Sequence, residues 1–301
     1  MAPSPAARDL ATFESHRPEL VALAYRMLGD VGRAQDVVQE AWLRWRRRRG
    51  QVDSPKAYLL TVVTRLCLNE LDSARARREE SRSNRLPEPV DLDAGGMALV
   101  EDLDRISMAF LVILQRLSAA ERAVFLLHDV FDFDHGEIAE IVGKSAAACR
   151  KLLERARKSI AAGRAVLRTS RPEHRRLLQA FVRAATAGDV GELIKLLTKD
   201  VVIVTDGGLR GARVGNVKNL SKPLEGADRV AAFVVAATRR GAVLQVEERE
   251  LNGQPAIVFR AGDRPFAAML LAVAKGKVQR IFFHADSERL SHLGPPSAPS
   301  K

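Results

Sequence analysis

The chain has 301 residues and carries 48 Lys and Arg against 37 Asp and Glu, a formal net charge of +11. This length predicts two or three compact units, and the charge favours a polyanionic partner, either nucleic acid or an acidic membrane surface. No apolar run reaches the roughly 18 residues that a membrane span needs, and the opening MAPSPAARDLATFE lacks the basic start and apolar core of a signal peptide. We therefore expect a cytoplasmic protein without a membrane partner.

The two cysteines, Cys67 and Cys149, lie far apart in the sequence, each inside an apolar helical pattern. This placement suggests neither a disulfide framework nor a zinc site. We expect both to be small core residues, and we expect no metal and no other cofactor.

Three structured blocks, with a linker between the first two, follow one another along the chain. Helical periodicity, with apolar residues three and four apart, extends from about Phe13 to Arg78. Residues 79–96 (EESRSNRLPEPVDLDAGG) lack this periodicity and contain proline, glycine and charges of both signs, which is typical of a linker. Helical periodicity returns from about Leu99 to Leu167. A helix pair then leads to the strand-like runs VVIVT, AVLQVEERE, PAIVFR, FAAMLLAV and VQRIFFHAD, which predict an α+β block, and the closing GPPSAPSK is expected to be disordered.

Residues 34–49, AQDVVQEAWLRWRRRR, change from acidic to basic. On a helix at least one tryptophan is expected in the core. Asp36, Glu40 and Arg44 share another face, either for an outside partner or as a solvated face braced by a Glu40–Arg44 pair of about 0.3–0.5 kcal/mol. The clustered arginines repel one another, and binding to a polyphosphate would relieve this repulsion. With the next amphipathic helix they form a cationic, aromatic edge suited to single-stranded DNA.

The stretch LSAAERAVFLLHDVFDFDHGEIAEIVGKSAAACRKLLERARKSI predicts a helix-turn-helix. Capping boxes start helices at Ser118–Glu121 and Asp134–Glu137. Gly143 ends the second helix, and Ser145 can cap a third. The apolar face of this third helix comprises Cys149, Leu152, Leu153, Ala156 and Ile160. Its other faces are cationic, which suits a major groove, and the small residues Ala146–Ala148 let the backbone approach DNA closely. The alternative is a helical hairpin with a solvated basic face.

A resemblance to a known family covers residues from about Phe13 to Leu167. The segments AYRMLGDVGRAQDVVQEAWLRW and SPKAYLLTVVTRLCLNEL, together with the helix-turn-helix stretch, resemble regions 2 and 4 of extracytoplasmic-function RNA polymerase sigma factors. The resemblance implies that core RNA polymerase and promoter DNA are the partners. Region 2 would dock on the clamp helices of the largest polymerase subunit and capture the non-template strand at the minus-ten element. Region 4 would place residues 145–157 in the minus-thirty-five major groove and pack on the polymerase flap.

Carried over residue by residue, the resemblance gives sets of candidate contacts. The polymerase contacts would be Asp36, Gln39, Glu40 and Leu43. The DNA contacts of region 2 would be Arg46, Arg47, Arg48, Arg49, Lys56, Arg65 and Asn69. The DNA contacts of region 4 would be Lys144, Ser145, Ala147, Arg150, Lys151 and Arg155.

The third block resembles the subgroup that carries a fused SnoaL-like domain, a curved sheet with helices of the nuclear-transport-factor-2 (NTF2) type. The resembling segments are RLPEP in the linker, TDGGLRGAR at 205–213 and NGQPA at 252–256. The DGG and NGQP segments are also typical of turns. The expected cis-regulatory residues are Leu86, Pro87, Glu88, Pro89, Asp206, Gly207, Gly208, Asn252, Gly253 and Pro255. The chain has Arg85 where the subgroup usually has tryptophan and Leu209 where it has a third glycine, so the contact of that tryptophan cannot be carried over.

The expected fold class is multi-domain: two all-α sigma domains, a region 2 helical bundle and a region 4 helix-turn-helix, followed by an α+β SnoaL/NTF2-like cone with a curved sheet. The expected boundaries are 1–78 for region 2, 79–98 for a flexible linker, 99–168 for region 4, 169–292 for the SnoaL-like domain and 293–301 for a disordered tail. A flexible linker of about 20 residues would span some 25 Å on average. Regions 2 and 4 could then separate onto two promoter elements.

The leading hypothesis is an alternative sigma factor whose SnoaL-like domain tunes its activity in cis through intramolecular contact with the sigma domains. Two alternatives remain, a stand-alone helix-turn-helix regulator and a polyketide-cyclase-like enzyme with a DNA-binding appendage. Such an enzyme could use ionisable groups beside the strand-like runs for proton transfer. These groups are Asp206, Glu247, His284 and Asp286. No spaced acid–base pair stands out beyond them, so we expect no enzymatic activity.

Overall fold

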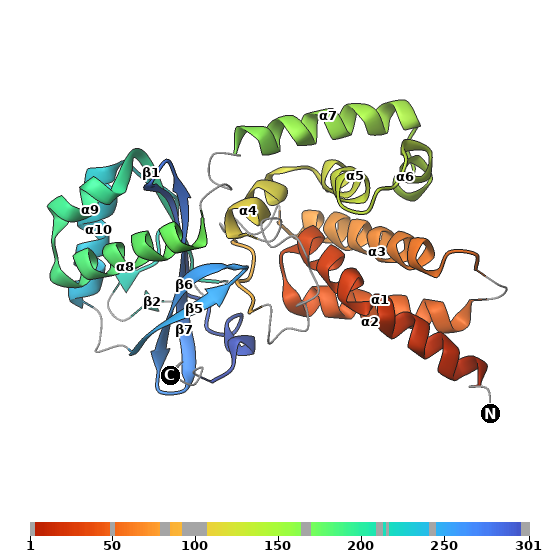
Figure 1. The fold of residues 1–301 in the computed structure, drawn as a ribbon, viewed down its shortest axis with the longest axis horizontal. Coiled ribbons are helices and arrows are strands. Elements are labelled where there is room, and N and C mark those ends of the chain that lie inside the picture. The colour runs from red at the N-terminus through yellow and green to blue at the C-terminus, as the bar shows by residue number, and fades with distance from the viewer. Residues whose placement is uncertain are drawn as a thin grey trace. The chain divides into compact units, whose positions relative to one another are not determined.

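The structure is a computed structural model that describes residues 4–48, 52–78, 85–91, 107–163, 170–208, 213–214, 217–240 and 245–295 (Figure 1). These residues fall into two compact units. The first contains the described residues between 4 and 78 and between 111 and 162. The second contains residues 85–91 and 107–110 and the described residues from 163 onward.

The first unit begins with the helices α1 (Pro5–Leu28), α2 (Val31–Arg47) and α3 (Pro55–Arg78), which pack on one another. The segment 20–28 of α1 is buried throughout. Gly29, at φ 69°, ends α1 by donating its N–H to the carbonyl of Tyr25. Asp30 then starts α2, because its carboxylate accepts a hydrogen bond from the N–H of Arg33 at 3.0 Å. The predicted helical bundle is confirmed.

The helices that follow are α4 (Met108–Arg116), whose first three residues belong to the second unit, and α5 (Ala119–Asp129), α6 (His135–Val142) and α7 (Ala146–Ala162). Both predicted capping boxes are present, at the starts of α5 and α6. Gly143, at φ 67°, closes α6, and the hydroxyl of Ser145 accepts from the N–H of Ala148 at 3.2 Å to cap α7. The predicted helix-turn-helix is therefore confirmed as α6, a glycine turn and α7. None of the described helices is long and apolar enough to cross a membrane.

Both cysteines are free and belong to the core of the first unit, as predicted. Burial raises the pKa of the Cys67 thiol well above its ordinary value. The thiol is therefore protonated and unreactive at neutral pH.

The second unit is α+β. Its helices are α8 (Arg171–Ala187), α9 (Val190–Leu196) and α10 (Ala227–Arg240), with a 3-10 turn at Ser291–Leu293. Its larger sheet has the strand order β4 (Leu224–Glu225), β1 (Leu197–Asp206), β8 (Lys277–His284), β7 (Arg264–Ala274), β6 (Gln254–Ala261) and β5 (Gln245–Leu251). β1 is parallel to β8, and the other neighbouring strands are antiparallel. The short strands β2 (Arg213–Val214) and β3 (Val217–Lys218) pair separately.

The core of the second unit lies between the sheet and its helices. Alternate strand residues supply the sheet side, since successive side chains point to opposite faces. The cluster includes Leu178, Phe181, Leu193, Val230, Val235, Ile203, Ile257, Leu271 and Ile281. Register shifts within the β1–β8, β6–β7 and β7–β8 pairs bend the strands. This open sheet with its helices is the SnoaL/NTF2-like α+β fold that the sequence predicts.

The sequence-predicted strand runs fall on β1, β5, β6, β7 and β8, whereas α10 and the short strands β2 to β4 were not predicted. At the end of the chain, Leu293 is buried, and the carbonyl of Gly294 accepts a hydrogen bond from Arg260 at 2.9 Å. The segment assigned to a disordered tail thus begins with packed residues, and its last six residues, 296–301, lie outside the described part.

Candidate functional site

The acidic face of α2 is accessible to solvent. Asp36 and Gln39 are exposed, and Glu40 and Leu43 are partly exposed. Because these residues are three and four positions apart, they lie on one side of the helix. Glu40 accepts a hydrogen bond from Nε of Arg44 at 3.0 Å, the pair expected from the spacing. Such an exposed pair adds little stability, so a partner can displace Arg44 from Glu40 at little cost. The four predicted polymerase contacts therefore form an available surface.

The basic end of α2 divides into engaged and available arginines. Trp45 is 2% exposed, which confirms the expected core tryptophan, and its Nε1 donates to the carbonyl of Asp9 at 3.0 Å. The guanidinium of Arg48 lies 3.3 Å from the centroid of the Trp45 ring and 2.6 Å from the Asp9 carboxylate. Arg46 and Arg47 are exposed. A phosphate can therefore reach Arg46 and Arg47 directly, whereas Arg48 already holds the start of α1; Arg49 lies outside the described residues.

On α3 the predicted DNA contacts differ in their surroundings. Asn69 is exposed. Nζ of Lys56 lies 2.9 Å from the Glu19 carboxylate, and both side chains are nearly half exposed. The guanidinium of Arg65 donates to the last carbonyls of α6, at 2.9 and 3.4 Å. A cation there is also favoured by the negative end of the helix dipole.

The helix-turn-helix presents its predicted contacts to solvent. Lys144, Ser145 and Ala147 are exposed at the turn and the start of α7, and Arg150, Lys151 and Arg155 are exposed along the helix. The opposite face buries Cys149, Leu153, Ala156 and Ile160, while Leu152 is only half-buried. A further cation of the helix, Arg157, donates to the carboxylate of Asp129 at 2.6 Å and so braces α7 on α5.

A buried arginine that the sequence analysis missed joins the two sets of helices in the first unit, α1 to α3 and α4 to α7. Arg122 of α5 is 5% exposed. It donates to the carbonyls of Leu114 at 2.8 Å and Leu117 at 3.5 Å, and also to the carbonyl of Met27 near the end of α1. Together with Arg65, it ties the helices predicted to bind the two promoter elements into one compact body.

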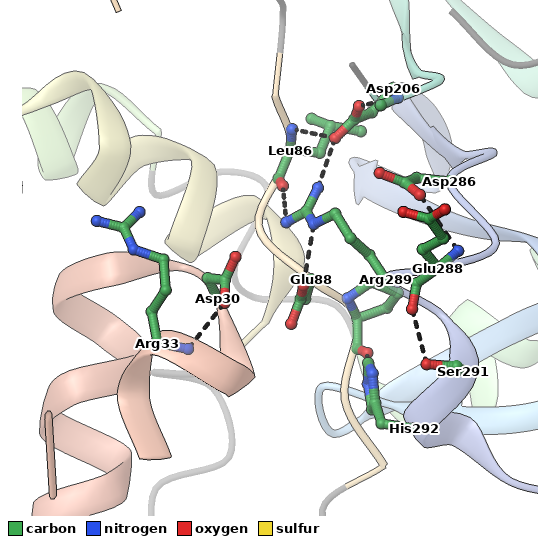
Figure 2. A network of polar contacts seen from close by, with 12 residues as sticks. Asp30, Arg33, Leu86, Glu88, Asp206, Asp286, Glu288, Arg289, Ser291 and His292 are labelled. Carbon is green, nitrogen blue, oxygen red and sulfur yellow. Dashed lines mark hydrogen bonds and ion pairs between the residues drawn. The ribbon is translucent and has the colours of Figure 1, made fainter. Parts of the chain in front are cut away.

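The RLPEP segment is held by a network of polar contacts in the second unit (Figure 2). The carboxylate of Asp206 accepts hydrogen bonds from the N–H of Leu86 and from Arg289, both at 2.8 Å. Arg289 also donates to the carboxylate of Glu88 and to the carbonyl of Leu86, each at 2.9 Å. Asp206 and Glu88 are buried and Arg289 nearly so. Arg289 is thus the hub of this site.

A second set of contacts fixes the following residues. The N–H of Val90 donates to Oδ1 of Asn252 at 3.1 Å, and the N–H of Asn252 donates to the carbonyl of Val90 at 2.7 Å. Asp91 pairs with Arg249 at 2.8 Å. Pro87 and Pro89, which have no N–H, are also buried. Residues 86–91 of the segment predicted as a linker are therefore bound to other residues of the second unit.

Both predicted glycine turns are confirmed. Gly208 has φ 68°, and a Cβ there would overlap the carboxylate of Asp286. Asn252 and Gly253, at φ 52° and 67°, form the hairpin turn between β5 and β6. Gly207 is half-buried and Pro255 is buried. Two of the three motifs thus contact each other directly, at Leu86–Asp206. Asn252 of the third motif bonds to Val90, the residue after RLPEP, which the sequence analysis did not include.

Three of the four ionisable groups considered for catalysis are paired with an arginine or buried. Asp206 binds Arg289, and Glu247 lies 2.6 Å from Arg260. His284 is 2% exposed, and burial followed by the charge of Arg289 lowers the pKa of this imidazole to about 3. It is therefore neutral at pH 7. Among the described residues, no group of three or more His, Cys, Asp or Glu side chains is placed to hold a metal ion.

Comparison with known proteins connects these sites. A family model described as Sigma-70 region 2 matches residues 12–77, and one described as Sigma-70, region 4 matches residues 107–160. The ECF RNA polymerase sigma factor SigJ of Mycobacterium tuberculosis is 37% identical over 236 residues, 77% of this chain and 74% of SigJ. The probable ECF RNA polymerase sigma factor SigI of the same organism is 34% identical over 278 residues, 90% of this chain and 91% of SigI.

The likeness extends to a solved structure. The crystal structure of the M. tuberculosis extracytoplasmic function sigma factor SigJ matches with a TM-score of 0.71 and 29% sequence identity, covering 96% of this chain and all of that one. The relatives span both the helical part and the sheet, so the match is not confined to the helix-turn-helix. The chain belongs to the family of extracytoplasmic-function RNA polymerase sigma factors.

Proposed function

We propose that this sigma factor contacts core polymerase through the acidic face of α2 and promoter DNA through two basic surfaces. The first surface is the end of α2 with α3, for melted DNA at the minus-ten element. The second is α7 with the turn before it, for duplex DNA at the minus-thirty-five element. Exposed arginines on both support the proposal, since they are open to phosphate. The protein would act in the cytoplasm, where polymerase is found.

We further propose that the C-terminal unit tunes this activity in cis. The observation that carries the proposal is the bound RLPEP segment, whose Leu86 N–H and Glu88 carboxylate meet Asp206 and Arg289. Regions 2 and 4, proposed at 1–78 and 99–168, are joined by residues 79–98, and the regulatory domain is proposed at 169–292. Holding 86–91 fixes six of the 20 residues of this connector. Because the two promoter elements lie more than two duplex turns apart, over about 70 Å, a fixed connector opposes their simultaneous binding.

The contacts of Arg122 and Arg65 support the same view. In the compact first unit α3 touches α5 and α6, so the two DNA-binding surfaces cannot reach elements that far apart. Promoter binding then requires the two sets of helices to part, and a bound connector makes parting less favourable. We propose no catalysis for the C-terminal unit, because the carboxylates of Asp206 and Glu247 are engaged by arginines.

Run-off transcription with purified core polymerase tests the proposal. The full chain should give a promoter-dependent transcript, and Arg289→Leu, which releases the segment, should raise its yield. Arg264→Leu is the matched control, because Arg264 is an exposed arginine of the same unit. Absence of both holoenzyme assembly and transcript would refute the promoter assignment, and equal yields from the two variants and the unmodified chain would refute tuning in cis.

The alternatives predict different results. A stand-alone regulator would bind its site tightly without polymerase, whereas the proposed sigma factor binds well only as holoenzyme. A cyclase-like enzyme would lose turnover on substitution of Asp206 or His284. Finding either behaviour would favour that alternative.

A further inference from the structure

The outward stripe of α7 contains an acidic residue. Residues at 147, 151, 154 and 158 follow one another at intervals of four, three and four, so they align along one side of the helix. All four are exposed, and they lie opposite the buried face of α7. Three of them are Ala147, Lys151 and Lys158, and the fourth is Glu154. If α7 enters a major groove, this stripe faces the floor of that groove.

Glu154 is the only acidic residue among the 17 of α7. Cations lie four positions away on both sides, at Arg150 and Lys158. Within the part of the chain that the structure describes, no hydrogen bond or ion pair involves the Glu154 carboxylate, although the comparable Glu40 is paired with Arg44. The carboxylate is therefore available to an outside donor.

The chemistry of the groove restricts what that donor can be. Phosphates line the walls of the groove and repel a carboxylate, so Glu154 gains nothing from the backbone contacts that suit its cationic neighbours. On the floor, the amino group at N4 of cytosine is the donor that glutamate side chains accept from. Residue 154 is three residues beyond residue 151, about 4.5 Å along the axis, which is a spacing close to that of successive base pairs, about 3.4 Å.

We propose that Glu154 is a specificity-determining residue that accepts a hydrogen bond from the N4 amino group of a cytosine in the minus-thirty-five element. The inference rests on the proposed function, because it requires α7 to enter that groove. Arg150 and Arg155, which are exposed on either side of the stripe, bind phosphates and set the register of Glu154. Glu154 thereby converts affinity for DNA in general into preference for one base pair.

Selection of promoters by the holoenzyme tests the proposal. The minus-thirty-five element is randomised, and templates are recovered after initiation by full-length protein with core polymerase. The unmodified chain should enrich cytosine at one position by about 5- to 150-fold over other bases. Glu154→Ala should abolish the enrichment at that position alone, and Glu154→Gln should shift it towards adenine, which an amide recognises.

Glu140→Gln is the matched control, because Glu140 is an exposed glutamate of the same helix-turn-helix outside the stripe. Removing either charge should increase non-specific binding to DNA, but only substitution of Glu154 should change base preference. An unchanged preference in Glu154→Ala, with the same uniform gain as in Glu140→Gln, would overturn the proposal while leaving the promoter function intact. Failure of the unmodified chain to start any promoter-dependent transcript would instead overturn the proposed function.

Discussion

Replacing Asp206 by asparagine should release the RLPEP segment. Asp206 is 4% exposed, and its carboxylate accepts from the N–H of Leu86, from Arg289 and from the N–H of Gly208, the last at 2.9 Å. An asparagine has one acceptor oxygen and no charge, so its amide group would face a donor. Each hydrogen bond to a charged group contributes about 1.5–3 kcal/mol, and breaking a buried ion pair costs about 3–5 kcal/mol. We expect the bound segment to lose about 3 kcal/mol, since Glu88 still pairs with Arg289.

Hydrogen exchange measures this loss directly. The N–H groups of Leu86 and Val90 are bonded to Asp206 and Asn252, so they report opening at the two ends of the segment. At about 1.4 kcal/mol for each factor of ten, exchange at Leu86 should accelerate roughly 100-fold. Val90 should be affected less, because its bonds remain. Asp263→Asn, at an exposed aspartate of the same unit, should leave both rates unchanged. Equal exchange at Leu86 in the two variants would refute the assigned role of Asp206.

Other substitutions test the remaining contacts. Arg122→Met should lower the unfolding free energy of the first unit by about 3 kcal/mol, because it removes buried bonds to carbonyls; the fluorescence of the two tryptophans reports this, and an unchanged midpoint would contradict it. His284 is held neutral with its pKa lowered to about 3, so stability is full above its ordinary pKa of about 6.5 and falls as the pH decreases towards 3. His284→Asn should therefore reduce the loss between pH 6.5 and 5, about 2 kcal/mol, in urea titrations, and an equal loss would exclude His284 as the cause. Arg47→Ala should weaken promoter binding for all sequences and lower the salt slope by about 1, whereas Arg48→Ala should chiefly destabilise the fold because Arg48 holds Asp9; binding and unfolding measurements with reversed results would refute this division.

Much of the fold is predictable because its boundaries carry local signals. Ser118 and Asp134 cap helices through their own side chains, and Gly143 adopts the left-handed conformation that ends α6. Such signals depend on neighbouring residues only, so a sequence displays them. α10 has a similar pattern, with buried Val230 and Val235, yet it follows a turn-rich stretch and was not predicted.

The contacts that organise the site are less visible in the sequence. Arg122 and Arg65 donate to main-chain carbonyls, which every residue has, so no partner residue type marks these contacts in advance. Arg289 lies 83 positions from Asp206 and outside every motif, and only the fold brings the two together. The RLPEP and DGG motifs were found by resemblance, and their contacts with each other emerge from the structure.

The bond between Arg65 and the end of α6 has a consequence for energetic coupling. The same guanidinium is predicted to contact the minus-ten strand, and one side chain cannot satisfy both partners at full strength. Binding of that strand and seating of α6 are then antagonistic, and by thermodynamic reciprocity each weakens the other by the same factor. Any partner that displaces the helix-turn-helix from α3 would thereby strengthen the binding of α3 to melted DNA, without contacting that DNA.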